Sequence, residues 1–165
     1  KLANFYSESI INNNIEYDFI FGPAYKGITL ATSISNSLYN AHNIIKPFCF
    51  NRKEIKKHGE SGIFVGSQPK GRALIVDDVI SSGKSIIESI DLLSNNNATP
   101  STVLVAFDRM ERGANEKASL EISSKYSIPV FSIITLDDII EFLTSEKMMA
   151  VELNSMIKYM KIYKG

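Results

Sequence analysis

The fold of this chain is decided by the stretch Arg72-Ala-Leu-Ile-Val-Asp-Asp-Val-Ile-Ser-Ser-Gly-Lys-Ser85. Its apolar run, Ala73 to Val76, predicts a short strand that is buried on both faces of a parallel sheet. We expect the strand to stop at two adjacent carboxylates, Asp77 and Asp78, where a hydroxyl- and glycine-rich turn leads into a helix. This order is typical of an anion site, because the free N–H groups and the dipole at a helix N-terminus favour a phosphate.

Two carboxylates beside a phosphate pocket would repel the phosphate unless another group intervenes. Mg²⁺ accepts carboxylate, water and substrate oxygens, and the hydroxyls of a ribose can donate to carboxylates. An anionic sugar phosphate would therefore satisfy both halves of the motif. The alternative is an acidic strand end at the surface, with Ser81 or Ser82 capping the next helix. The buried strand before the acids and the Ser-Ser-Gly turn after them favour the ligand site.

The composition indicates one globular domain over residues 1–165. A content of 44% hydrophobic residues is enough for a core, and the net charge of +0 gives no sign of a nucleic-acid or membrane partner. No apolar stretch approaches the length of a membrane span. The single cysteine, Cys49, cannot form an internal disulfide, so we expect a reducing compartment, the cytoplasm.

The alternation of strands and helices predicts an α/β fold, a doubly wound, mostly parallel five-stranded sheet with helices on both faces. The expected strands lie near residues 18–21, 47–52, 73–76, 102–107 and 130–134. Amphipathic patterns predict helices near residues 2–14, 27–40, 84–95, 115–126 and 148–163, and one that Thr135 opens with Asp138 in a capping box. If the strands at 18–21 and 73–76 are neighbours, their following turns flank the topological switch point, where such sheets bind ligands.

Two further turns carry candidate binding residues. The segment Gly22-Pro-Ala-Tyr-Lys-Gly27 repeats the strand–turn–helix design, so Tyr25 and Lys26 would face a ligand at the sheet edge; a solvated turn is the alternative. Arg109, which follows the strand at 102–107, could pair with a carboxylate or stack on a planar base. A local ion pair with Asp108 or Glu111 is its alternative.

The connection over residues 53–70 is long for a compact α/β domain. It contains several glycines, and cationic or titratable side chains gather at its start, namely Arg52, Lys53, Lys56, Lys57 and His58. Long charged loops often close over a substrate. We therefore predict a mobile lid, with an ordinary solvated loop as the alternative.

Taken together, these segments resemble the type I phosphoribosyltransferases and, among them, the orotate phosphoribosyltransferases of the bacterial type. The likeness rests on four segments in order: Phe21-Gly-Pro-Ala-Tyr-Lys-Gly27, Cys49-Phe-Asn-Arg-Lys-Glu-Ile-Lys-Lys-His-Gly-Glu60, Leu74-Ile-Val-Asp-Asp-Val-Ile-Ser-Ser-Gly-Lys-Ser85 and Asp108-Arg-Met-Glu-Arg-Gly113. The resemblance implies transfer of phosphoribose from 5-phosphoribosyl 1-diphosphate (PRPP) to orotate, giving orotidine 5′-monophosphate and diphosphate in pyrimidine (UMP) biosynthesis.

The resemblance also implies roles for single residues. Asp77 and Asp78 match the acids that hold the ribose hydroxyls, and Ser81 and Arg109 match positions that hold orotate. The 5′-phosphate cradle is matched by Val79, Ile80, Ser81, Ser82, Gly83, Lys84 and Ser85. The diphosphate loop and the mobile loop are matched by Tyr25, Lys26, Arg52, Lys53, Lys56 and His58. The catalytic residues implied are Arg52, Lys56, His58 and Asp78, with Lys56 and His58 as leaving-group contacts.

By the same resemblance, Mg²⁺ is the cofactor, held mainly by substrate and water with no protein ligand assigned. The family's homodimer, in which the mobile loop closes over the neighbouring subunit's site, is the implied assembly. The sequence departs from the family pattern at Ser81, where Thr is common, and at Lys84, which is an extra cation. The helical pattern is already under way at Lys1, so we expect that the family's N-terminal hood segment is missing here.

Three rival functions remain to be weighed. A regulator that keeps the PRPP site as a sensor should carry a basic face or a DNA-binding module, and the neutral net charge argues against it. The second rival is a phospho-acceptor receiver domain. Such domains resemble one another in having a lysine at the end of the last strand, and Phe131-Ser-Ile-Ile-Thr135 has none, which argues against this rival. A transferase for another base is the third rival. The segment around Arg109 and the stretch from Asn51 to Glu60 favour orotate, but without the hood segment the choice of base stays partly open.

Overall fold

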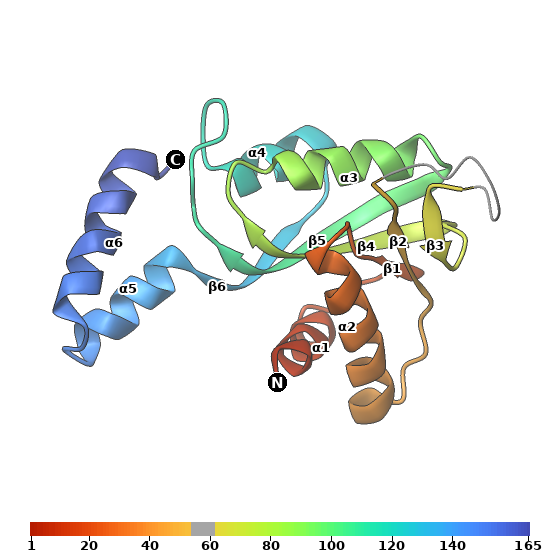
Figure 1. Cartoon of the computed structure of the whole chain (residues 1–165), viewed down its shortest axis with the longest axis horizontal. Coiled ribbons are helices and arrows are strands. Elements are labelled where there is room, and N and C mark those ends of the chain that lie inside the picture. Colours follow the sequence, from red (N-terminus) through yellow and green to blue (C-terminus); the bar gives the residue numbers. More distant parts are fainter. Residues whose placement is uncertain (54–61) are drawn as a thin grey trace.

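The structure is a computed structural model, which describes residues 1–53 and 62–165. Within these residues, one six-stranded sheet has the order β3-β2-β1-β4-β5-β6 (Figure 1). The strands are β1 (Phe19–Phe21), β2 (Phe48–Asn51), β3 (Phe64–Gly66), β4 (Gly71–Ile80), β5 (Ala98–Asp108) and β6 (Val130–Thr135). Strand β3 is antiparallel to β2 and the other pairs are parallel. The predicted doubly wound, mostly parallel sheet is confirmed, with one more strand than expected.

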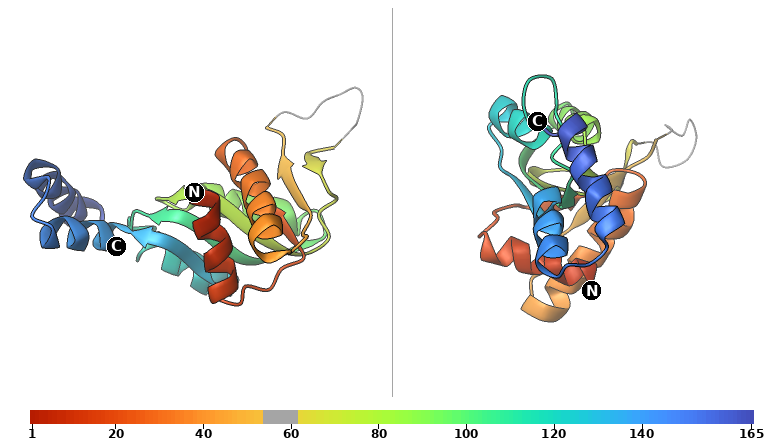
Figure 2. Two further views of the ribbon diagram at one scale, coloured as in Figure 1. Left: turned by 90° about the horizontal axis from the view of Figure 1, so that it is seen from below. Right: turned by 90° about the vertical axis from the view of Figure 1, so that its left-hand side faces the viewer.

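The helices follow the predicted order with somewhat different ends. They are α1 (Leu2–Asn12), α2 (Lys26–His42), α3 (Lys84–Ser94), α4 (Ala118–Tyr126), α5 (Leu136–Ser145) and α6 (Ala150–Tyr163). The predicted capping box of α5 is present, because Thr135 and Asp138 bond each other's backbone N–H groups. Helices α5 and α6 extend beyond the carboxyl end of β6 (Figure 2). No described helix is long and apolar enough to cross a membrane.

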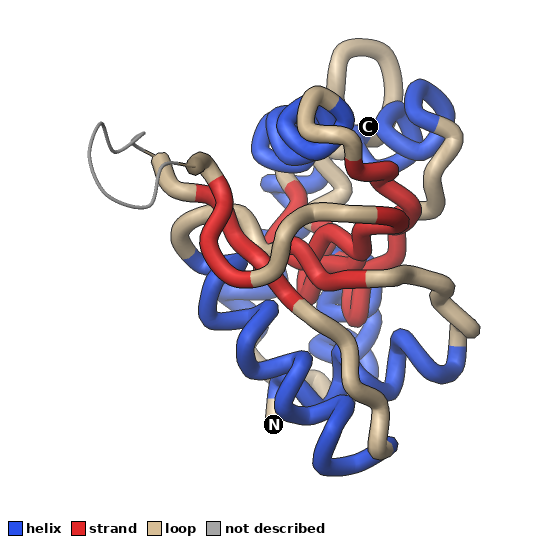
Figure 3. The backbone as a smooth tube through the Cα atoms, turned by 90° about the vertical axis from the view of Figure 1, so that its right-hand side faces the viewer, coloured by secondary structure: helices blue, strands red, loops and turns tan. Residues whose placement is uncertain are grey.

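Helices cover both faces of the sheet (Figure 3). Helices α1 and α2 pack on one face through Tyr6, Ile10, Ile34 and their neighbours. Helices α3 and α4 pack on the other face. This arrangement follows from the right-handed crossovers between parallel strands, which place successive helices on one side or the other of the sheet according to where the next strand is added.

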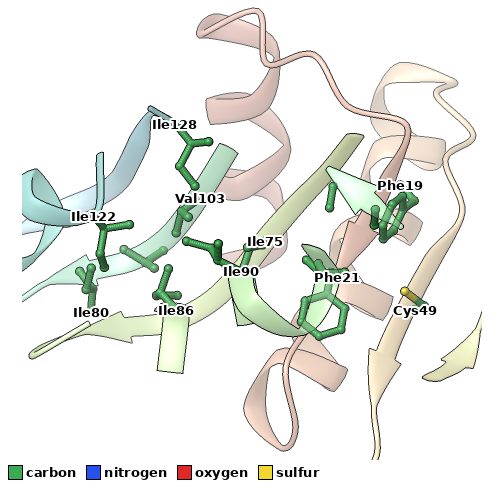
Figure 4. Close-up of a cluster of buried hydrophobic side chains, with 14 residues drawn as sticks. Phe19, Phe21, Cys49, Ile75, Ile80, Ile86, Ile90, Val103, Ile122 and Ile128 are labelled. Atoms are coloured by element: carbon green, nitrogen blue, oxygen red, sulfur yellow. The ribbon is translucent and has the colours of Figure 1, made fainter. Parts of the chain in front are cut away.

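The core divides into two clusters because successive side chains of a strand point to opposite faces. In β4, Ile75 belongs to the cluster under α3 and α4, whereas Leu74 and Val76 belong to the cluster under α1 and α2. The first cluster includes Ile86 and Ile90 of α3 (Figure 4). The apolar run from Ala73 to Val76 is thus buried on both sides, as its sequence predicts.

Two predictions about the extent of the strands were wrong: one strand is longer than expected, and one short strand was missed. Strand β4 does not stop at Val76 but continues through the acids to Ile80, because β5 runs beside it and pairs Val79 with Phe107 and Ile80 with Asp108. The predicted loop over residues 53–70 contains β3, which pairs antiparallel with β2 through Phe50 and Val65. Both segments are strands because their backbones pair with a neighbouring strand. Such pairing cannot be predicted from the polarity of the local sequence.

The order of the strands fixes the location of the site. Strand β1 lies between β2 and β4, with Phe21 opposite both Cys49 and Ile75. The chain leaves β1 toward one side of the sheet and later adds β4 on the other side. The turn after β1 and the turn after β4 therefore flank the topological switch point, as predicted.

Candidate functional site

The acid pair lies in the last third of β4. Asp77 is buried, with 8% of its surface exposed, and its two carboxylate oxygens accept from the Asp78 N–H at 2.9 Å and from the Ser85 hydroxyl at 3.1 Å. Burial raises the pKa of Asp77 above its ordinary value, although these two hydrogen bonds act in the opposite direction. Asp77 therefore ties the end of β4 to the first turn of α3.

Helix α1 contacts the acid pair from the face of the sheet that lies opposite to α3. The hydroxyl of Tyr6 is fully buried and donates to the main-chain oxygen of Asp77 at 2.7 Å. Burial and the nearby charge of Asp77 both raise the pKa of Tyr6, so the hydroxyl stays protonated and able to donate. Tyr6 was not among the predicted site residues, because 71 positions separate it from Asp77.

The turn between β1 and α2 is closely packed. A Cβ on Gly22 would lie 2.0 Å from the oxygen of Gly27, and one on Gly27 would lie 2.6 Å from Cδ of Pro23. Only glycine fits at both positions. The side chain of Asn51, at the end of β2, accepts from the Ala24 N–H at 2.9 Å, and the Ala24–Tyr25 peptide bond is cis. The close packing of Gly22 on Gly27 and the hydrogen bond from Ala24 to Asn51 thus fix the backbone that carries Tyr25 and Lys26.

Lys26 joins this turn to the acid pair. Its ammonium lies 2.5 Å from the Asp78 carboxylate, and this hydrogen bond raises the pKa of Lys26. The Lys26 side chain is 75% exposed and that of Asp78 is 30% exposed. An ion pair as exposed as this contributes little to stability. Its main consequence is that a cation and a carboxylate lie together at the open edge of the sheet.

The turn after β4 encloses a small cavity of about 290 Å³. Its lining residues are Val79, Ile80, Ser81, Ser82, Gly83, Lys84, Ser85, Ile86 and Glu88. Gly83, at φ +79°, is the N-cap residue that precedes α3, and no side chain caps the helix. The alternative in which Ser81 or Ser82 caps α3 is therefore wrong, and the first N–H groups of the helix, whose first residues line the cavity, have no side-chain cap.

Of the predicted loop cations, Arg52 and Lys53 lie directly after β2. The Lys53 ammonium is 4.6 Å from the centre of the Tyr25 ring, which places it beside the turn that carries Lys26. The Arg52 N–H donates to the oxygen of Ile63 at 2.7 Å. Lys56 and His58 lie outside the described residues.

Ser81 and Arg109 are brought together by the pairing of β4 with β5. Ile80 is opposite Asp108, and the Arg109 N–H donates to the Ile80 oxygen at 3.0 Å. The Arg109 guanidinium pairs with Glu111 at 3.0 Å, so the local ion pair that the sequence left open is present. The guanidinium also lies 5.1 Å from the centre of the Tyr159 ring, a contact that the sequence did not suggest.

Metal ligands are sparse among the described residues. No three His, Cys, Asp or Glu side chains gather there as a metal cluster would require. The two carboxylates at the end of β4 nevertheless suit a hard cation that also takes oxygens from substrate and water.

The chain is similar to known proteins over almost its whole length. The profile of the family described as "Phosphoribosyl transferase domain" matches residues 1–149. The orotate phosphoribosyltransferase of Thiobacillus denitrificans is 46% identical over 164 residues, which cover 99% of this chain and 77% of that protein. The enzyme of the same name from Nitrosomonas europaea is 48% identical over 99% of this chain and 72% of its own.

The chain belongs to the orotate phosphoribosyltransferase family.

The fold of this family is also what the structure shows. The crystal structure of the orotate phosphoribosyltransferase of Francisella tularensis superposes with a TM-score of 0.83, at 33% identity, over 99% of this chain and 79% of that one. The turns after β1 and β4, which the sequence singled out, flank the switch point in this chain. Three residues outside the predicted site, Tyr6, Asn51 and Tyr159, contact it from other parts of the chain.

Proposed function

We propose that this member of the orotate phosphoribosyltransferase family, acting as one domain over residues 1–165, transfers phosphoribose from PRPP to orotate. The products are orotidine 5′-monophosphate and diphosphate, in pyrimidine biosynthesis. One observation carries the assignment of the site. The acid pair has the Lys26 turn on one side, at 2.5 Å, and the 290 Å³ cavity of the β4–α3 turn on the other. A ribose with anionic groups at both ends matches this order of cation, carboxylates and phosphate cradle.

Each part of the site then has a task. The N–H groups and hydroxyls of residues 81–85 bind the 5′-phosphate, and Asp77 and Asp78 accept from the ribose hydroxyls. Lys26, with Tyr25 and Lys53 beside it, faces the diphosphate. Arg109, next to Ser81 at the sheet edge, binds the planar, anionic base.

The chemistry needs stabilisation of charge and exclusion of water. As the bond between C1 and the diphosphate breaks, positive charge grows on the ribose ring and negative charge on the departing diphosphate. Carboxylates on the ribose side and cations on the diphosphate side favour that separation. We assign the leaving-group contacts to Lys56 and His58, which with Arg52 would complete the cationic side when the loop closes. When bound, Mg²⁺ offsets the charge of the diphosphate oxygens.

The family resemblance further supports a homodimer in which the loop acts on the neighbouring subunit's site. To test this, Asp78→Asn and Lys56→Ala chains, each of which should turn over much more slowly than the unaltered chain, are mixed. Partial recovery of turnover is expected, because one of the two sites in a heterodimer then combines an intact acid pair with an intact loop. No recovery with verified heterodimers would mean that each site closes within one subunit.

The choice of base is tested by offering several bases with PRPP and separating the products. We expect orotidine 5′-monophosphate from orotate and no nucleotide from uracil, adenine or hypoxanthine, since these lack the carboxylate that Arg109 would bind. A nucleotide formed from one of the other bases in preference to orotate would overturn the assignment. The proposal places this reaction in the cytoplasm, where the buried thiol of Cys49 stays reduced.

A further inference from the structure

Helix α6 reaches the site through Tyr159. The Arg109 guanidinium donates from Nη2 to the Tyr159 hydroxyl, and that hydroxyl donates to Glu111 Oε1. The Nε of Arg109 lies 3.0 Å from the same Glu111 oxygen, and the ring of Tyr159 lies 5.1 Å from the guanidinium carbon. The three side chains therefore form a closed set of contacts in which each touches the other two.

We propose that Tyr159 is a positioning residue for Arg109, and that α6 thereby sets the affinity of the site for the base. This inference rests on the proposed function, in which Arg109 binds orotate. Tyr159 does not contact the substrate itself but fixes the plane and direction of the guanidinium that does.

The contacts restrict one edge of the guanidinium and leave another available. The Nε of Arg109 pairs with Glu111, and the Tyr159 hydroxyl accepts a hydrogen bond from Nη2. In the described part of the chain no acceptor lies at Nη1, and 40% of the Arg109 side chain is exposed. An arginine binds a planar carboxylate best with two parallel N–H groups. Holding the Nε edge in place therefore presents the remaining donors in a fixed direction.

Both partners of Arg109 are suited to a fixed position. The side chain of Glu111 is only 18% exposed, so its carboxylate is largely removed from water and needs donors. Burial, followed by the hydrogen bond to Glu111, raises the pKa of Tyr159. The Tyr159 hydroxyl consequently keeps its proton and donates it to Glu111. A flexible arginine side chain loses less freedom on binding a ligand if it is already held in this way.

Helix α6 is attached to the segment that follows Arg109 rather than to the core. None of its residues is buried, yet the Arg112 N–H donates to the Tyr163 oxygen at 2.7 Å and the Gly165 N–H donates to the Met110 oxygen at 3.1 Å. The Lys164 ammonium also pairs with Asp137 at the start of α5, at 2.8 Å. These contacts hold α6 where Tyr159 meets Arg109. The helix itself lies beyond the end of the sheet (Figure 2).

The test separates base binding from binding of the rest of the nucleotide. Calorimetry gives the dissociation constants of orotidine 5′-monophosphate and of ribose 5-phosphate, and their ratio reports the contribution of the base. Tyr159→Ala should weaken orotidine 5′-monophosphate binding about tenfold, as expected for one lost cation–π contact with its hydrogen bond, and should change ribose 5-phosphate binding less than about twofold. Tyr159→Phe keeps the ring but not the hydroxyl, so its orotidine 5′-monophosphate affinity should lie between those of the unaltered chain and Tyr159→Ala. Ile162→Ala, an exposed residue on the same helix, is the control and should change neither constant.

The outcomes distinguish this inference from the proposed function. In the Arg109→Ala background, the Tyr159→Ala change should have no further effect on the ratio, because the group that it positions is gone. Equal weakening of both ligands by Tyr159→Ala would indicate a merely structural role and overturn the inference. The inference would also be overturned if Tyr159→Ala left the ratio of the two dissociation constants unchanged while Arg109→Ala abolished the preference for orotidine 5′-monophosphate over ribose 5-phosphate. If the unaltered chain binds both ligands equally well, the assignment of the base site fails, and the inference fails with it.

Discussion

Lys26 Nζ lies 2.5 Å from Asp78 Oδ2, although 52 positions separate the two residues in the sequence. The contact exists because β1 and β4 are parallel neighbours, so that the turns at their carboxyl ends meet at one edge of the sheet. It joins the segment that the account assigns to the diphosphate with the one assigned to the ribose.

Replacement of Asp78 tests the ribose assignment. Asp78→Asn keeps the shape of the side chain but removes its charge, and hydrogen bonds to a charged acceptor are worth about 1.5–3 kcal/mol. We expect PRPP binding to weaken about tenfold or more in calorimetry. The control is Asp91→Asn, an exposed acid on α3. Unchanged affinity in Asp78→Asn would remove Asp78 from the ribose site.

The raised pKa of Asp77 predicts how stability depends on pH. Because the folded chain holds this proton to a higher pH than the unfolded chain does, unfolding releases protons above the ordinary value of 3.8. The Asp77 contribution to stability is therefore present at low pH and falls as the pH rises through the raised pKa.

Unfolding by urea at a series of pH values, from about 4 to about 7, measures this dependence. Asp77→Asn cannot titrate, so its free energy of unfolding should decline less over that range than that of the unaltered chain. Parallel curves for the two chains would show that the carboxyl does not titrate abnormally.

The close approach of Gly22 and Gly27 predicts a cost for any side chain there. In Gly27→Ala the new Cβ would lie 2.6 Å from Pro23 and 2.7 Å from the Gly22 carbon, so the backbone of the turn must shift. We expect the free energy of unfolding to fall by about 1–3 kcal/mol. Gly62→Ala is the matched control, because among the described residues the nearest atom to its Cβ, apart from its chain neighbours, would be the Phe64 oxygen at 3.9 Å. Equal stability of the two variants would show that the turn adapts without strain.

Lys84 is the cation that departs from the family pattern, and its effect should be electrostatic. Its side chain is 82% exposed and lies 3.9 Å from Glu88, one helical turn further on. Lys84→Ala should weaken ribose 5-phosphate binding about threefold at low salt, and the difference should shrink as salt is added. Glu88→Gln should strengthen ribose 5-phosphate binding at low salt. Lys158→Ala, an exposed position on α6, should leave this binding unchanged. A salt-independent loss in Lys84→Ala would indicate a packing role instead.

The sequence predicted the parts of the fold that depend on local pattern. The run from Ala73 to Val76 indicated a strand buried on both faces, and Thr135 with Asp138 indicated a helix start; both are present. The continuation of β4 to Ile80 and the short strand β3 were missed. These segments pair with β5 and β2 through their backbones, and neither carries a long apolar run.

The site was predictable to the same extent. Glycines and hydroxyls after strands indicated the turns at Lys26 and Gly83, and the acid pair indicated the end region of β4. The residues that hold those turns were not predictable, because their contacts arise only when the chain has folded. Tyr6 reaches Asp77 from the first helix and Tyr159 reaches Arg109 from the last, and in the sequence each resembles an ordinary aromatic residue of an amphipathic helix.

The most direct test of the account is the loss of the ultraviolet absorbance of orotate after addition of PRPP and Mg²⁺. We predict a loss that requires both PRPP and Mg²⁺ and that Asp78→Asn slows. If the chain binds PRPP but does not consume orotate, it is not an orotate phosphoribosyltransferase, and a sensor or a transferase for another base takes its place.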